Sequence, residues 1–168
     1  MQARMTANEY HSIVVCVDGY DQHILRGRLY NPFLQGAVHF TGLMDFLLAV
    51  EHLLDEMNFP QPFAQVRSFR PQAKAREEVR RDNLEQRGEK GTFVMKVIFR
   101  QNASWQGTVT WLEEGREESF RSALELAFLM DSALMTKVSL PADSGPTFQS
   151  KESKEMLEEK INTSTIGK

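Results

Sequence analysis

Four cationic side chains are the residues of this sequence best suited to bind a ligand or a partner. Arg26 and Arg28 lie two residues apart in one run of alternating apolar residues, and Lys96 and Arg100 lie in another. Side chains alternate between the two faces of a strand, so we expect these four on the face opposite the apolar residues. Clustered cations favour an acidic partner. The sequence therefore predicts a basic binding surface in a chain whose formal net charge is −3.

Metal binding and enzymatic catalysis are not expected from the remaining polar residues. The four histidines are not spaced as zinc ligands are. Asp18, Asp21 and His23 lie close together, but a turn rich in Asp and Gly needs no metal to explain it. Cys16 has no neighbouring base to activate it as a nucleophile. We therefore predict no metal, no cofactor and no enzymatic activity.

The turn after Arg100 adds Asn102 and Ser104 to the predicted surface. The string Arg100-Gln-Asn-Ala-Ser-Trp-Gln-Gly107 resembles the second half of the motif of PilZ domains, and Arg76 and Arg80 have the spacing of its first half. The resemblance implies a six-stranded β-barrel that binds cyclic di-GMP, with arginines contacting phosphate and guanine edges. Cyclic dinucleotide binding is therefore the alternative function, and an ordinary hairpin turn is the competing interpretation of the string.

The same string is followed by Phe120-Arg-Ser-Ala-Leu-Glu-Leu126. Together they resemble small proteins of Gram-positive anaerobes, chiefly over residues 91–135. That resemblance implies no activity and no site residue.

Two stretches 80 residues apart share one pattern of apolar residues. Residues 91–135 match residues 11–55 without a gap, so that Val14 corresponds to Val94, and Gly27 to Gly107. Each stretch has two alternating runs, typical of strands, followed by a run with helical spacing that begins near Phe40 or Phe120. The pattern predicts a duplicated strand–strand–helix unit.

An isolated two-stranded hairpin is marginally stable, so each unit needs its helix and the other unit. We expect the α+β class: a tandem ββα duplication that forms one four-stranded antiparallel sheet with two helices on one face. Such a chain would be a monomer equivalent to a fused symmetric dimer. Trp105 and Trp111 are expected in its core. The predicted boundaries are a tail at 1–10, units at 11–59 and 91–140, a charged linker at 60–90 with an exposed helix over Lys74–Gln86, and a disordered tail at 141–168.

Composition narrows the functional classes further. The net charge of −3 gives no drive toward nucleic acid, and no apolar run reaches the length of a membrane span. A single cysteine, Cys16, fits a reducing compartment. We therefore expect a cytoplasmic, non-enzymatic binding or regulatory module with a protein partner, without nucleic acid or membrane.

Overall fold

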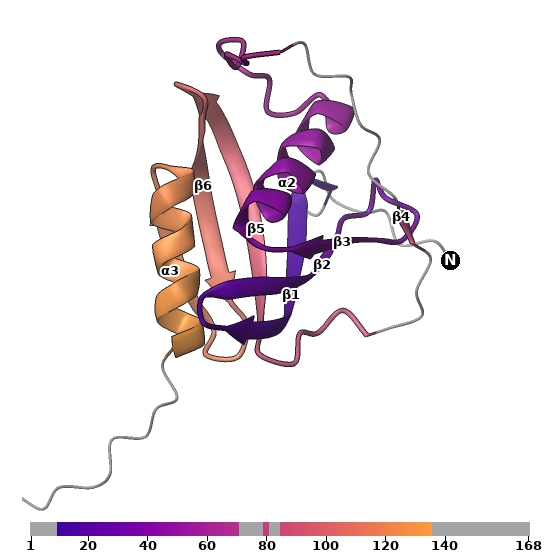
Figure 1. Cartoon of the computed structure of the whole chain (residues 1–168), viewed down its shortest axis with the longest axis vertical. Coiled ribbons are helices and arrows are strands. Elements are labelled where there is room, and N and C mark those ends of the chain that lie inside the picture. The colour runs from indigo at the N-terminus through magenta and orange to yellow at the C-terminus, as the bar shows by residue number, and fades with distance from the viewer. Residues whose placement is uncertain (1–9, 71–78, 81–84, 136–168) are drawn as a thin grey trace, which may run out of the picture. The chain divides into compact units, whose positions relative to one another are not determined.

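The computed structural model describes residues 10–70, 79–80 and 85–135, all within the first of two compact units, residues 1–137. In this part of the chain seven strands form one antiparallel sheet in the order β4-β3-β2-β1-β5-β6-β7, accompanied by helices α2 and α3 (Figure 1). The elements are β1 (Ser12–Asp21), β2 (Ile24–Tyr30), β3 (Ala37–Thr41), α2 (Leu43–Met57), β4 (Val79–Arg80), β5 (Gly91–Gln101), β6 (Ser104–Trp111), β7 (Arg116–Phe120) and α3 (Ala123–Met135).

The predicted four-stranded α+β fold of two ββα units is wrong, because the sheet has seven strands and only two helices accompany it. The missed strands β3 and β7 each follow a turn and precede a helix. Phe40 and Phe120, which we expected to begin the helices, are strand residues that point into the core. β7 has the sequence Arg-Glu-Glu-Ser-Phe, whose first four residues are exposed. A short polar edge strand of this kind lacks the apolar alternation by which strands are recognised.

The predicted linker and tail are only partly described. Val79 and Arg80, inside the predicted helix over Lys74–Gln86, instead form β4, which pairs with Ala37 and Val38 of β3. The rest of that predicted helix up to residue 84 lies outside the described residues, as do residues 1–9 and the tail at 141–168. Neither described helix is long and apolar enough to cross a membrane.

The backbone pairing of the first half recurs 80 residues later. Val17 pairs with Gly27 and Val97 pairs with Gly107, and a bulge follows each pair. The central strands β1 and β5 are antiparallel, and Val14 pairs with Val94. Because those two residues are themselves 80 apart, an approximate twofold axis of the pairing passes between them. The two halves of the sheet are therefore related by this axis in register.

One cluster of buried apolar residues lies between the sheet and both helices. It includes Ile13, Phe40, Phe46, Phe120 and Met130. Gly27 and Gly107 permit its tightest packing. A Cβ on Gly27 would lie 2.0 Å from the carbonyl oxygen of Cys16 and 2.8 Å from Phe40, and a Cβ on Gly107 would lie 1.9 Å from the carbonyl oxygen of Lys96. Only glycine fits at either position.

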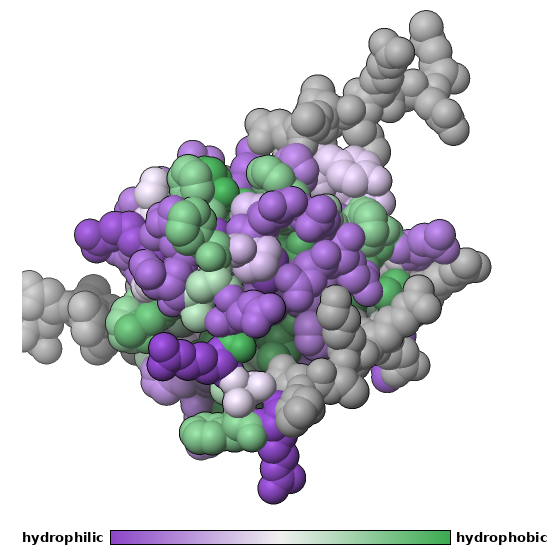
Figure 2. Space-filling view, turned by 90° about the horizontal axis from the view of Figure 1, so that it is seen from above, coloured by the Kyte–Doolittle hydropathy of each residue, from purple (hydrophilic) through white to green (hydrophobic). Residues whose placement is uncertain are grey.

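Hydrophobic side chains also reach the surface, in several separate places between hydrophilic ones (Figure 2). The exposed large residues include Phe63, Val66 and Phe69 of the segment after α2. They also include Leu43 at the start of α2, and Leu124 and Phe128 on α3.

Candidate functional site

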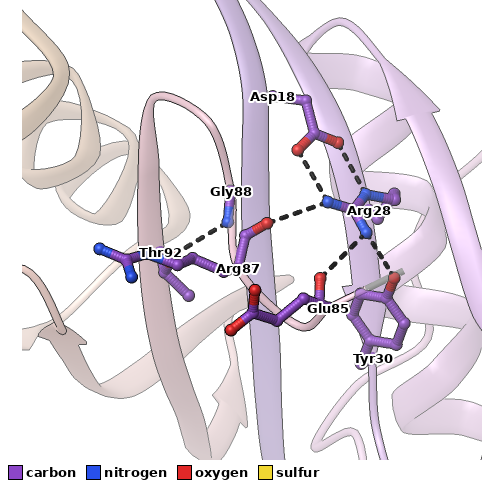
Figure 3. Close-up of polar contacts among 7 residues, drawn as sticks. All are labelled: Asp18, Arg28, Tyr30, Glu85, Arg87, Gly88 and Thr92. Carbon is purple, nitrogen blue, oxygen red and sulfur yellow. Dashed lines mark hydrogen bonds and ion pairs between the residues drawn. The ribbon is translucent and has the colours of Figure 1, made fainter. Parts of the chain in front are cut away.

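Arg28, the centre of the predicted basic surface, is buried and fully engaged. Its guanidinium donates to both carboxylate oxygens of Asp18, at 2.7 and 2.9 Å, and to the hydroxyl of Tyr30 at 2.6 Å (Figure 3). It also donates to the carbonyl oxygens of Glu85 and Arg87, so the segment before β5 covers this part of the sheet. The hydrogen bond from Arg28, its largest cause, holds the pKa of Asp18 below its usual value. Arg28 thus fastens this segment to the sheet.

Arg100 lies on the helix side of the sheet, so the prediction that it shares a face with the other cations is wrong. The bulge between Val97 and Phe99 inserts an extra residue into β5 and reverses the alternation beyond it. The Arg100 guanidinium therefore reaches α2, where it donates to Glu51 and, at 2.7 Å, to Asp55. Its side chain is only 4% exposed.

The other predicted site residues are dispersed. The side chain of Arg26 is 51% exposed and pairs with Asp21, whereas Lys96 is half-buried in β5. Asn102 is an exposed turn residue with a φ of 53°. Ser104 accepts a hydrogen bond from the backbone N–H of Ala123 and so caps the start of α3. The structure does not bring these residues together into one basic surface.

The arginines that resemble the PilZ motif do not gather either. Arg76 lies outside the described residues, and Arg80 lies exposed in β4 at the opposite edge of the sheet from β6 and β7. The Asn102–Ala103 turn joins β5 to β6 with positive φ at both residues, as Gln22–His23 joins β1 to β2. Among the described residues no three His, Cys, Asp or Glu side chains gather to hold a metal ion.

An open pocket that the sequence did not indicate lies between α3, the first turn of α2 and the β1–β2 hairpin. Its volume is about 350 Å³. We call it the hairpin pocket; its lining residues are mostly apolar: Tyr20, His23, Leu25, Leu43, Phe46, Leu124, Ala127, Phe128, Met130, Asp131 and Leu134. Size and apolar lining match those of ordinary small-molecule sites.

Three polar side chains meet at the rim of the hairpin pocket. The Tyr20 hydroxyl donates to Asp131 Oδ1, and His23 Nδ1 lies 2.9 Å from the same oxygen. The His23 ring nitrogen also lies 3.2 Å from the Tyr20 hydroxyl. Burial and the hydrogen bond to Asp131 raise the pKa of Tyr20 to about 12. The hydrogen bond from Tyr20 and then that from His23 hold the pKa of Asp131 below its usual value. The rim therefore combines a neutral phenol with an ionised carboxylate.

The register explains why this pocket is open in one half. The equivalent of Leu25 is Trp105, and the equivalents of Tyr20 and Asp131 are Arg100 and Glu51. Trp105 is buried, and its Nε1 donates to Glu51 Oε2 at 2.6 Å.

At that equivalent place the structure has a hollow of only about 10 Å³. The indole occupies volume that the smaller Leu25 leaves empty. Sequence comparison of the two halves could have shown this loss of volume, because all three pairs of residues keep the offset of 80.

Two larger-scale hollows lie along the outer flanks of the helices. One, of about 400 Å³, is bounded by α2, Val38 of β3 and Val79 of β4. The other, of about 260 Å³, has Glu118 and Leu129 in the positions equivalent to Val38 and Ala49 of the first. Since both halves have one, these hollows follow from how each helix crosses its edge strand. The hairpin pocket is particular to one half.

Comparison of the chain with protein-family models, curated proteins and solved structures gives no significant match.

Proposed function

We propose that this protein is a non-enzymatic binding module and that its ligand enters the hairpin pocket. The single observation that carries the proposal is the Leu25 side of this pocket, where a space of about 350 Å³ stands open beside Tyr20, His23 and Asp131. Apolar walls supply affinity through the burial of apolar surface, and a few polar groups orient the ligand.

The arrangement of the two halves supports a binding role acquired by one of them. We propose that the halves arose by internal duplication, on the support of strand pairings and bulges that recur at an offset of 80 residues. A duplicated chain can keep one half packed, as at Trp105, while the other opens a site at Leu25. In this account the chain acts as a monomer. A reducing compartment such as the cytoplasm suits its single, buried Cys16.

A protein partner of acidic character has less support from this geometry. Arg28 and Arg100 are each paired with carboxylates and buried, so their charge is not presented to solvent. A buried cation that is already paired has little capacity to bind another anion.

A neutral apolar dye tests the proposed site. N-phenylnaphthylamine fluoresces strongly only in apolar surroundings, and we expect the wild-type protein to bind it saturably. Leu25→Trp should abolish the signal because the indole would fill the pocket, as Trp105 does in the other half.

Val79→Trp is the matched control, since it places an indole in the flank hollow beside β4. It should leave dye binding unchanged. Loss of the signal in Val79→Trp but not in Leu25→Trp would place the site in the flank hollow and refute the proposal.

A further inference from the structure

The charge of the hairpin pocket is carried by Asp131. No lysine or arginine lines the pocket, and His23 is cationic only when it is protonated. Tyr20 keeps its proton because its pKa lies at about 12. A ligand in the pocket therefore meets one carboxylate beside uncharged walls.

Asp131 has an oxygen available for a ligand. Within the described part of the chain, both of its hydrogen bonds end on Oδ1, from Tyr20 and from His23. These bonds fix the carboxylate and leave Oδ2 as an acceptor. The side chain remains 37% exposed, so a group inside the pocket mouth can approach it.

The walls beside this carboxylate suit an apolar body attached to a cation. Phe128 and Leu124 are 64% and 63% exposed on α3, and Leu43 is 45% exposed at the start of α2. Aromatic rings such as Phe128 and Tyr20 also attract a cation held near their faces. An anionic ligand would instead be repelled by Asp131 with no arginine or lysine in the lining to offset it.

We propose that the hairpin pocket selects small amines, in which a protonated nitrogen binds Asp131 and an apolar or aryl body fills the space beside Leu25. This inference rests on the proposed function, because it assigns the ligand class of the same site. The carboxylate supplies selectivity for charge, and the walls supply most of the affinity.

Three compounds that share one apolar body test this assignment: naphthylethylamine, naphthylethanol and naphthylacetate. Calorimetric titration of the wild-type protein at neutral pH should give the tightest binding for the amine, weaker binding for the alcohol and the weakest for the acetate. A charge-assisted hydrogen bond at a partly exposed site corresponds to about a tenfold preference for the amine over the alcohol.

Asp131→Asn should remove this preference and leave binding of the alcohol unchanged. The amide keeps an acceptor for Tyr20 but has no charge. Glu56→Gln is the control, because it removes one negative charge from α2 outside the pocket lining, and it should keep the preference.

The possible results separate the two proposals. Equal binding of amine and alcohol by the wild type would overturn the amine assignment and leave the pocket as a site for neutral ligands. Tighter binding of the acetate would also overturn it. Binding of none of the three compounds would overturn the amine assignment and the proposed function together. Because this series uses the wild-type protein, it is decisive even if Asp131→Asn does not fold.

Discussion

Leu25 and Trp105 occupy equivalent positions in their two hairpins, one paired with Tyr20 and the other with Arg100. Both are buried in the same core cluster. The larger residue closes its half of the molecule and binds Glu51, whereas the smaller one borders an open pocket. This single difference in side-chain volume accounts for the main asymmetry between the helix-bearing surfaces of the two halves.

Trp105→Leu should open a second pocket and destabilise the protein. The change removes a buried indole and its hydrogen bond to Glu51, and the expected loss of unfolding free energy is about 2–4 kcal/mol. Urea denaturation measures it. Leu25→Met is the control, with an expected loss under about 1.5 kcal/mol because it conserves volume. A loss below about 0.5 kcal/mol for Trp105→Leu would show that the indole does not support its half.

Gly107→Ala should be strongly destabilising. Its Cβ would lie 1.9 Å from the carbonyl oxygen of Lys96, so β5 and β6 would have to separate there. We expect a loss above about 2 kcal/mol, comparable with other severe packing defects. Gly19→Ala is the matched control in a strand, because its Cβ meets only the flexible side chain of Arg26 at 3.1 Å. Thermal unfolding should rank the two variants in this order; the reverse order would contradict the geometry.

Arg28→Glu should destabilise the fold far more than Arg26→Glu. At the first position, reversal places a carboxylate beside Asp18 in a buried site, and breaking a buried pair costs about 3–5 kcal/mol. Arg26 lies two residues earlier in the same strand, and its pair with Asp21 is exposed, so its reversal should cost less than about 1 kcal/mol. Denaturant unfolding of both variants tests the difference. Equal losses would mean that the segment carrying Glu85 and Arg87 does not bury Arg28.

Tyr20 should make the protein sensitive to alkaline pH. Its pKa is raised from 10.0 to about 12 in the folded state, so the folded state holds the phenol proton more tightly than the unfolded state. The resulting stabilisation is fully present below pH 10 and is lost as pH rises through about 12. Tyr20→Phe should show a shallower decline in stability over this interval. Identical pH profiles for the two proteins would contradict the bond between Tyr20 and Asp131.

The repeated pattern could be predicted from the sequence because it depends on apolar spacing. Trp105 and Phe120 point to the core as their apolar character implies. The third strand of each half could not be predicted in this way. Ala37–Thr41 runs directly toward a helix and was taken as part of it, and Arg116–Phe120 carries its polar residues at an exposed edge.

The predicted binding surface depended on an alternation that the sequence does not fully determine. A bulge after Val97 moves Arg100 to the other face, and nothing in local residue type marks that bulge. Arg28 lost its exposure to a segment from outside its own hairpin. The meeting of Tyr20 with Asp131, 111 residues apart, likewise depends on how α3 lies over the first hairpin.

The most direct test of the binding site is the position of a bound apolar probe. Nuclear Overhauser contacts between N-phenylnaphthylamine and methyl-labelled protein would identify the residues that surround it. We predict contacts to the methyl groups of Leu25, Leu124 and Leu134, which line the hairpin pocket. Contacts confined to Leu34, Val38 and Leu53, which line the flank hollow beside α2, would contradict the account.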